Sequence, residues 1–146
     1  MAQLIFKKAF FRFFVVGLLI CLCTGTTSAF SYSESKLTAD DPIQGAEFGR
    51  SVAIDGNIVV IGAAEGSDEV AVGAGAAYVF KRIGNAYVQE AKLIAPDAEL
   101  GAEFGRAVAV KGNVIVVGAR FASSGSVTRA GAAYIYKKKV CVQGGI

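Results

Sequence analysis

A stretch of six residues occurs twice, and this repetition constrains the fold more than any other feature of the chain. Gly-Ala-Glu-Phe-Gly-Arg stands at positions 45–50 and again at 101–106, which is 56 residues later. The similarity extends well beyond the motif, because 19 of the 36 residues in 45–80 are identical to their counterparts in 101–136. Such a period is typical of architectures in which similar units bury their apolar faces against each other. The chain is therefore expected to be a repeat protein.

Each repeat predicts strands, and no helical period occurs after residue 30. In the first repeat, strands are expected at about 50–55, 58–62, 76–81 and 87–95. Gly56 between the first two strands supplies the positive φ that a short hairpin prefers. The second strand is continuously apolar and β-branched, which indicates burial on both faces. In the fourth strand Glu90 and Lys92 share one face, as suits an exposed edge. The predicted fold class is all-β.

Antiparallel four-stranded units with this period favour the blades of a β-propeller, while a solenoid of stacked hairpins stays open as an alternative. Two repeats are expected, at about 45–100 and 101–136, within a domain of residues 30–136. Residues 33–39 align with 89–95 at the same 56-residue offset, so they predict an additional outer strand at the N-terminus. Residues 137–146 leave the repeat pattern and are expected to form an irregular tail. Two blades cannot enclose an axis, so the architecture is interpreted as a partial propeller.

The first 29 residues have the features of a secretory signal peptide. A basic start is followed by an apolar run of eleven residues, Phe13–Cys23, and by the small residues Thr27, Ser28 and Ala29 at the expected cleavage site. The run is too short to span a bilayer, which needs about 20 apolar residues. The protein is therefore expected to be secreted or associated with the cell envelope, without a membrane span in the mature chain. A retained N-terminal anchor is the alternative.

Charge gives no reason to expect a nucleic-acid partner. The chain has 15 basic and 12 acidic residues, but three of the basic residues lie in the expected signal peptide. The mature chain would then carry 12 charges of each sign and no net charge, and a basic patch is the usual mark of nucleic-acid binding. Of the three cysteines, only Cys141 lies beyond the signal peptide, so no internal disulfide is expected.

Two kinds of residue pair recur in both repeats: Phe48-Gly49 with Phe104-Gly105, and Gly62-Ala63 with Gly118-Ala119. Together with the run Gly75–Phe80, they resemble the phenylalanyl-glycyl and glycyl-alanyl-prolyl repeat, the FG-GAP repeat. This repeat is similar to those of the seven-bladed propeller head of integrin α chains, and many exported bacterial proteins also carry it. The chain departs from the pattern after each Gly-Ala pair, where Ala64 and Arg120 replace the proline.

The resemblance would imply a calcium loop between the first two strands of a repeat, but the residues do not support one. Asp55-Gly56-Asn57 offers one carboxylate, and Lys111-Gly112-Asn113 offers none. Calcium takes six to eight oxygen ligands. We therefore expect no metal site and no other cofactor.

Catalytic chemistry is not expected either. The chain has no histidine, which excludes Ser-His-Asp and Cys-His catalysis and histidine-ligated metals. Glu47 and Glu103 recur at the same position of each repeat, each with an arginine three residues later. This repetition indicates an ion pair or a turn-capping role rather than a pair of acid–base catalysts. Phe48 and Phe104 are expected to fill the contacts between blades.

Candidate ligand-contact residues lie where the two repeats differ. The loop that starts at Glu65 is acidic, whereas its counterpart starting at Arg120 is not. Loops that vary on a constant scaffold often carry recognition, although solvated linkers are the alternative. The candidates are Glu65, Asp68, Arg120 and Phe121.

The resemblance implies a non-catalytic binding or cell-adhesion module with an unknown protein or glycan ligand. Two alternatives stay open: a truncated structural fragment of a larger propeller without its own ligand, and accessory repeats of an exported hydrolase. Self-association is also expected, because the apolar strands of two blades share a single mutual contact and each leaves one face open.

We predict that the cell cleaves the chain after Ala29, because small residues follow a short apolar run at this point. N-terminal sequencing of the exported protein should start at Phe30. A protein that retains Met1 and stays in the membrane fraction would contradict the prediction and indicate an anchor.

Overall fold

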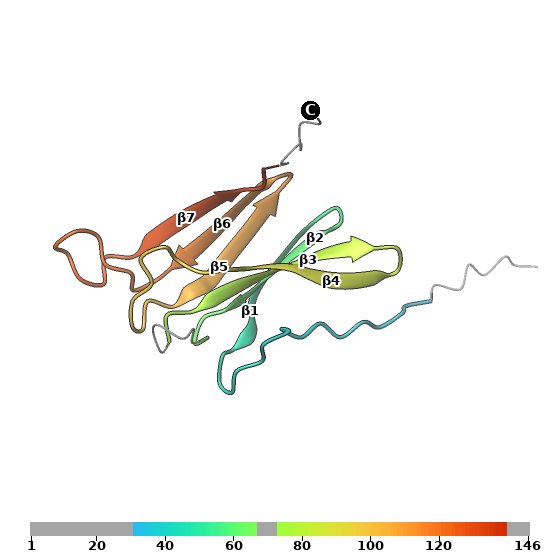
Figure 1. Ribbon diagram of the computed structural model, residues 1–146, viewed down its shortest axis with the longest axis horizontal. Coiled ribbons are helices and arrows are strands. Elements are labelled where there is room, and N and C mark those ends of the chain that lie inside the picture. Colours follow the sequence, from blue (N-terminus) through green and yellow to red (C-terminus); the bar gives the residue numbers. More distant parts are fainter. Residues whose placement is uncertain (1–30, 67–72, 140–146) are drawn as a thin grey trace, which may run out of the picture. The chain divides into compact units, whose positions relative to one another are not determined.

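Seven antiparallel strands in two sheets form the described part of the protein (Figure 1). The computed structural model describes residues 31–66 and 73–139. The first sheet has the order β1-β2-β3-β4 and the second the order β5-β6-β7. The strands are β1 (Phe48–Asp55), β2 (Ile58–Ala63), β3 (Ala76–Ile83), β4 (Ala86–Leu93), β5 (Phe104–Lys111), β6 (Val114–Ala119) and β7 (Ala132–Lys137). The all-β prediction is confirmed, and the two sheets are consistent with partial β-propeller blades.

The chain divides into two units, Met1–Glu34 and Ser35–Ile146. The second unit holds every named strand. The expected signal peptide and Cys141 lie outside the described residues. None of the described residues belongs to a helix that is long and apolar enough to cross a membrane.

The hairpins form where the sequence places them. Gly56, Gly84 and Gly112 have φ of 56°, 61° and 57°, and each is the first residue of a two-residue turn. The turns set the register, so that Asp55 pairs with Ile58 and Ile83 with Ala86. With this register, Val60 and Val117 are completely buried in the centre of the second strand of their sheets.

Each sheet begins with the same irregularity. The pairing of β1 with β2 shifts between Phe48 and Ser51, and that of β5 with β6 shifts between Phe104 and Ala107. The glycine after each phenylalanine has a strongly positive φ, 95° at Gly49 and 92° at Gly105. Glycine adopts this region without the steric cost that a side chain brings. The phenylalanine–glycine pair therefore builds a bulge that bends the inner end of the strand.

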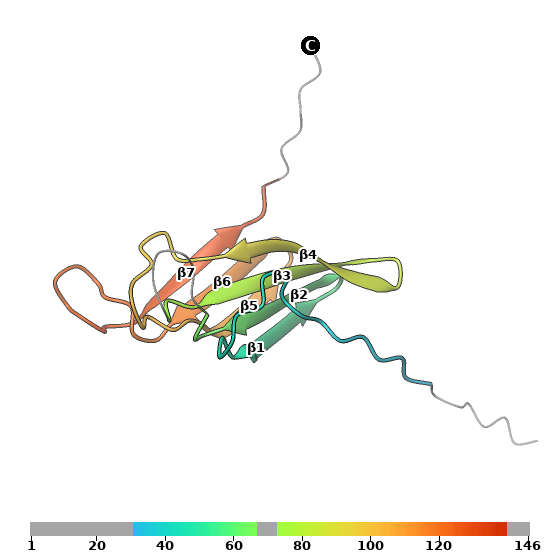
Figure 2. The same ribbon diagram turned by 60° about the horizontal axis from the view of Figure 1, so that its bottom comes forward.

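The two sheets pack against each other through β5, which contacts β1 and β2 as well as its own sheet (Figures 1 and 2). Phe104 lies in this contact and is completely buried. Its apolar cluster joins Val60 and Ala77 of the first sheet to Val117 and Ala119 of the second. The inner strand of the second sheet is thus the main connection between the sheets.

Phe48 differs from Phe104, contrary to the expectation that both fill contacts between blades. Phe48 is half-buried and packs on Tyr78 and Phe80 of its own sheet, with ring centroids 5.4 and 6.2 Å apart. Phe104 makes the equivalent contacts with Tyr134 and Tyr136 at 5.4 and 6.1 Å. The difference is that the first sheet packs on the backbone side of Phe104, whereas no described strand covers Phe48 in this way.

The expected outer strand at residues 33–39 is wrong, since residues 31–47 contain no strand. A strand requires a neighbouring edge that shares its backbone hydrogen bonds, and no described strand pairs with this segment. The side chains of Leu37 and Ala39 pack instead on the cluster around Tyr78 and Phe80. The expected tail also begins one residue later than position 137, because β7 includes Lys137.

We predict that the two phenylalanines contribute unequally to stability. Phe104→Ala should lower the free energy of unfolding by about 3–5 kcal/mol, because it leaves a cavity between two sheets. Phe48→Ala should cost roughly 1–2 kcal/mol, because the ring is only partly buried and contacts one sheet. Urea unfolding of both variants measures the difference, and equal losses would show that Phe48 is buried as deeply in solution as Phe104.

Candidate functional site

Three loops of the two sheets surround one hollow, which we call the loop-end hollow. These loops join β2 to β3, β4 to β5, and β6 to β7. The hollow has a volume of about 420 Å³. It is lined by Glu65, Glu99, Leu100, Gly101, Glu103, Phe121, Ser123, Thr128 and Arg129. Residues that are up to 64 positions apart in the sequence therefore meet at one end of the sheets.

The structure brings together two of the four candidate residues from the sequence. Glu65 and Phe121 line the same hollow. Arg120 lies beside them, because its guanidinium carbon is 4.6 Å from the centroid of the Phe121 ring. Asp68 lies outside the described residues. Arg129 also stacks on Phe121, and its guanidinium carbon lies 4.0 Å from the ring centroid. Two arginine side chains therefore make cation–π contacts with the same ring.

The carboxylates of the loop-end hollow are not equivalent. Glu99 accepts hydrogen bonds from the backbone N–H and the hydroxyl of Ser123, the latter at 2.8 Å, and so ties two loops together. Glu103 forms an ion pair with Arg106 at 3.5 Å. Among the described residues Glu65 forms no ion pair. The hollow thus combines the Glu65 carboxylate, a cation–aromatic stack and the exposed side chain of Leu100.

The Glu–Arg pairs have the structural role expected from their repetition. Glu47 and Arg50 are 3.4 Å apart, and Glu103 and Arg106 are 3.5 Å apart. Both glutamates have a positive φ, 54° and 56°, which is uncommon for a residue with a side chain. The carbonyl of each glutamate accepts a hydrogen bond from the N–H of its arginine, at 2.9 and 3.2 Å. These residues form the tight turn that precedes the bulge.

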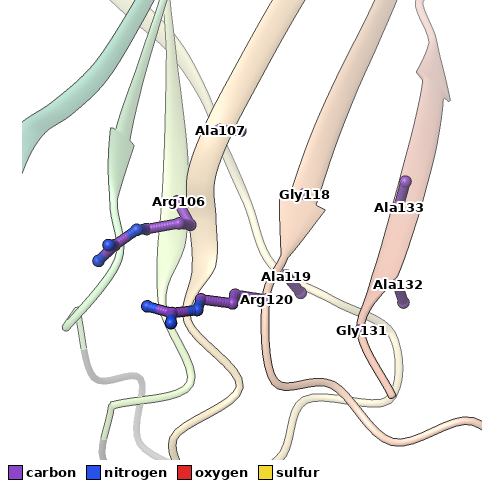
Figure 3. Close-up of a pocket in the computed structure, with 8 residues that line it drawn as sticks. All are labelled: Arg106, Ala107, Gly118, Ala119, Arg120, Gly131, Ala132 and Ala133. Atoms are coloured by element: carbon purple, nitrogen blue, oxygen red, sulfur yellow. The ribbon is translucent and has the colours of Figure 1, made fainter. Parts of the chain in front are cut away.

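A second hollow opens on the face of the second sheet, and we call it the sheet hollow. Its volume is about 430 Å³ (Figure 3). Figure 3 shows the side chains of Arg106 and Arg120 extended in the same direction, away from Gly118 of β6 and the alanines of β7. The lining residues are Arg106, Ala107, Gly118, Ala119, Arg120, Gly131, Ala132 and Ala133. An apolar floor with such small side chains offers no group for chemistry and suits close approach of another backbone.

Sequence reasoning missed a pair of tyrosine–aspartate contacts between the sheets and the preceding segments. The Tyr134 hydroxyl donates to Asp97 at 2.7 Å, and the Tyr136 hydroxyl donates to the carbonyl of Ile94 at 2.6 Å. In the first repeat Asp41 accepts a hydrogen bond from Lys92 at 2.5 Å, and the Lys92 ammonium also lies 5.6 Å from the centroid of the Tyr78 ring. Asp41 and Asp97 are 56 residues apart, as are Tyr78 and Tyr134, so the repeat itself contained the signal.

The same contacts shift the pKa values of these groups. Burial, followed by the hydrogen bond to Asp97, raises the pKa of Tyr134 to about 12. Burial also raises the pKa of Tyr78 and of Tyr136. The hydrogen bond from Lys92 lowers the pKa of Asp41. Each shift favours the protonation state that keeps the segment before a sheet attached to it.

The acidic residues in the described part of the chain do not gather into a metal-binding group. Within residues 31–66 and 73–139, no group of three or more histidine, cysteine, aspartate or glutamate residues could hold a metal ion. The carboxylates of the loop-end hollow are partly engaged with Ser123 and Arg106.

Comparison with known proteins gives a match to one family. The model of the FG-GAP repeat matches residues 32–80 and 87–136, which is more than half of the chain. The first match starts at residue 32, so it includes the segment before the first sheet. No curated protein matches the chain.

We predict that stability decreases between pH 10 and about 12, owing in part to Tyr134. Its pKa is raised in the folded protein, so the folded state holds this proton up to about pH 12 while the unfolded chain releases it near 10. The stabilisation is complete below pH 10 and is lost as the pH rises to 12. Tyr134→Phe should make the decline of the unfolding free energy over this interval shallower.

Urea unfolding at several pH values, together with tyrosinate absorbance, measures this effect. Asp97→Ala removes the hydrogen-bond acceptor and the negative charge, and should move the titration of Tyr134 towards its ordinary value. A titration in which the Asp97 variant has the same midpoints as the wild type would contradict the assigned cause.

Proposed function

The chain belongs to the FG-GAP repeat family, and on this basis we propose that it is an exported, non-catalytic binding module. Its ligand is a protein or a glycan, as in cell adhesion, and the contact surface is the loop-end hollow. FG-GAP repeats are generally a non-catalytic repeat module, which agrees with the absence of histidine from the sequence. Export rests on the signal-like residues 1–29.

The convergence of three loops, two of which differ between the repeats, is the observation that supports this proposal. The strands of the two repeats are nearly interchangeable, whereas Glu65 of the first repeat corresponds to Phe121 of the second. Both residues nevertheless line one hollow. Loops that vary on a rigid scaffold are where binding functions concentrate. The volume of about 420 Å³ also lies within the usual range of ligand sites.

The lining residues suggest the chemistry of the ligand. Glu65 accepts hydrogen bonds, while Ser123 and Thr128 contribute hydroxyl groups to the same hollow. Leu100 is 76% exposed at the rim and provides an apolar contact. A ligand with hydroxyl or amino donors beside a small apolar face would satisfy these groups. Sugars and short polar peptide segments both have this character.

Binding to arrays of glycans and of extracellular proteins tests the proposal. A ligand found in this way should bind the double variant Glu65→Gln/Leu100→Ser at least about tenfold more weakly, which corresponds to a loss of about 1.4 kcal/mol. Ile83→Ser is the matched control, because Ile83 is exposed on the hairpin between β3 and β4. Thermal unfolding of each variant checks that the fold is retained.

Two results would contradict the proposal. The first is the absence of binding to every member of both arrays. The second is a ligand whose affinity changes equally in the double variant and in the Ile83→Ser control, because the contact would then not involve the loop-end hollow.

A further inference from the structure

The contact between the two sheets is made of two surfaces. The inserting surface is the inner strand of the second sheet, β5, with Phe104, Gly105, Val108 and Val110. The receiving surface is the part of the first sheet that it covers. Three hydrogen bonds join them: Phe104 N–H to the carbonyl of Ala74 at 2.9 Å, Ser51 hydroxyl to the carbonyl of Gly105 at 2.7 Å, and Gly112 N–H to Asp55 at 2.5 Å.

The receiving surface is fitted closely to the inserted backbone. A Cβ atom added at Gly62 would overlap the carbonyl oxygen of Gly105, and one added at Gly75 would overlap the backbone of Phe104. A Cβ atom added at Gly105 would overlap the carbonyl oxygen of Ala76. Ala63, Ala64 and Ala77 are completely buried beneath it. Small residues are therefore required on both sides of the contact.

The second sheet has the same receiving surface, and in this structure it is open. The residues that correspond to Ser51, Gly62, Ala63, Ala64, Gly75, Ala76 and Ala77 after 56 positions are Ala107, Gly118, Ala119, Arg120, Gly131, Ala132 and Ala133. All seven line the sheet hollow (Figure 3). A Cβ atom added at Gly118 would have only ordinary contacts, with Ala107 Cβ at 3.6 Å. The sheet hollow is thus an unoccupied receiving surface.

The apolar side chains around the sheet hollow are correspondingly exposed. Ile135 of β7 is 65% exposed, whereas its counterpart Val79 in the first sheet is 5% exposed. Ala133 is exposed, whereas its counterpart Ala77 is completely buried. Part of this difference arises because β7 has no fourth strand beside it among the described residues.

The inserting surface is also present a second time and open, on β1. Gly49 has no atom within 4 Å of an added Cβ, in contrast to Gly105. Val52 and Ile54 are 67% and 64% exposed, whereas their counterparts Val108 and Val110 pack in the cluster between the sheets. The residues that lead into the two surfaces, 45–50 and 101–106, are identical.

We propose that the sheet hollow binds β1 of a second copy of this chain, in a head-to-tail contact that reproduces the contact between the two sheets. Residues 45–50 of one copy then lie against the second sheet of the other copy. They pack there as residues 101–106 pack against the first sheet within one chain. The continuity of an existing interface and the identity of the inserted hexapeptide support a second copy as the occupant.

The segment before β1 fits the same arrangement. Leu37 packs on the first sheet, as its counterpart Leu93 packs on the cluster of the second sheet. Leu93 also pairs with Ala77 of β3, but Leu37 pairs with no strand in the described part of the chain. In the head-to-tail contact the open edge of β7 in the second copy supplies such a strand, with Leu37 opposite Ala133. The outer strand that was expected at residues 33–39 would then form between copies.

Three substitutions make the contact between copies weaker than the internal one. Ala107 stands in place of Ser51, and Lys111 in place of Asp55, so two of the three hydrogen bonds are lost. Arg120 stands in place of the buried Ala64, and its guanidinium must lie at the rim of the contact. There the guanidinium can form an ion pair with Glu47 of the incoming copy. Within one chain, the counterpart of Glu47 is Glu103, which lines the loop-end hollow together with Glu65.

A head-to-tail contact closes into a ring if its rotation allows and otherwise continues into a fibre. Each copy contributes two sheets, so a closed ring contains an even number of blades. Propellers of about four to eight blades correspond to two to four copies.

Static light scattering tests the proposal on the protein purified as the cell processes it. The molar mass should be a multiple of the chain mass at high concentration. Gly118→Ala should give a monomer over the same range, with a Kd raised at least about 30-fold, because its Cβ would meet Gly49 of the incoming copy. The double variant Val52→Lys/Ile54→Lys should do the same from the opposite surface. Ile83→Lys is the control, because Lys139 occupies its place in the second repeat.

Mixing separates a head-to-tail contact from a symmetric one. Gly118→Ala retains an intact inserting surface, and Val52→Lys/Ile54→Lys retains an intact receiving surface. An equimolar mixture should therefore form 1:1 dimers, although each variant alone is monomeric. A mixture that stays monomeric would overturn the head-to-tail geometry.

A gain of affinity provides the converse test. Ala107→Ser/Lys111→Asp restores the two lost hydrogen-bonding groups and should tighten association roughly 5- to 150-fold. Thermal unfolding of every variant verifies the fold, and Ile135→Glu replaces Gly118→Ala if the latter unfolds. A wild type that is monomeric at every concentration overturns the proposal, as does an oligomer whose mass is the same in all variants.

Discussion

The contact of the β5 backbone with β2 and β3 determines the arrangement of the two sheets. At this contact Gly62, Gly75 and Gly105 leave no space for a Cβ atom on either side. Because main chain approaches main chain, the sheets come close enough for Phe104, Val60 and Val117 to be completely buried in one cluster. Protein interiors are packed so densely that a single methyl group at such a position would separate the sheets. The packing of the two sheets therefore depends on these glycines as much as on the buried side chain of Phe104.

The loop-end hollow follows from the same contact. The turn with a positive φ at Glu103, followed by the bulge at Gly105, directs the chain from the β4–β5 loop into the contact. The N–H of Phe104 then bonds to Ala74 in the loop between β2 and β3. Two loops are held together in this way, and Glu99 joins the third through Ser123. A binding surface made of variable loops can thus be positioned by residues that do not vary between the repeats.

Local sequence was sufficient to predict what depends on neighbours along the chain. The glycine turns and the β-branched runs located all seven strands to within about two residues, because hairpin register follows from turn geometry. The strand at residues 33–39 failed for the opposite reason. Its sequence is compatible with a strand, but a strand also needs a partner elsewhere in the molecule, and no described strand of the same chain pairs with this segment. Local propensity cannot reveal whether that partner is present.

The candidate site was predictable to a similar extent. Glu65 and Phe121 were found because the repeats differ there, whereas Leu100 and Arg129 enter the hollow only through the packing of one sheet on the other. The contact between Asp97 and Tyr134 could have been found, because Asp41 and Tyr78 precede them by the same 56 residues. Aligning the polar residues of the two repeats, in addition to the glycines and aromatic residues, would have predicted this contact.

The differences between the two repeats also bear on the order of assembly. The inserted hexapeptides are identical, but Ser51 and Asp55 each provide a hydrogen-bonding group that Ala107 and Lys111 do not. Two hydrogen bonds of about 0.5–1.5 kcal/mol each favour the internal contact over a contact between copies. The internal contact also forms within one chain and has no cost of bringing two molecules together. An identical motif can therefore complete the fold of each copy first and leave the second, weaker surface for reversible association.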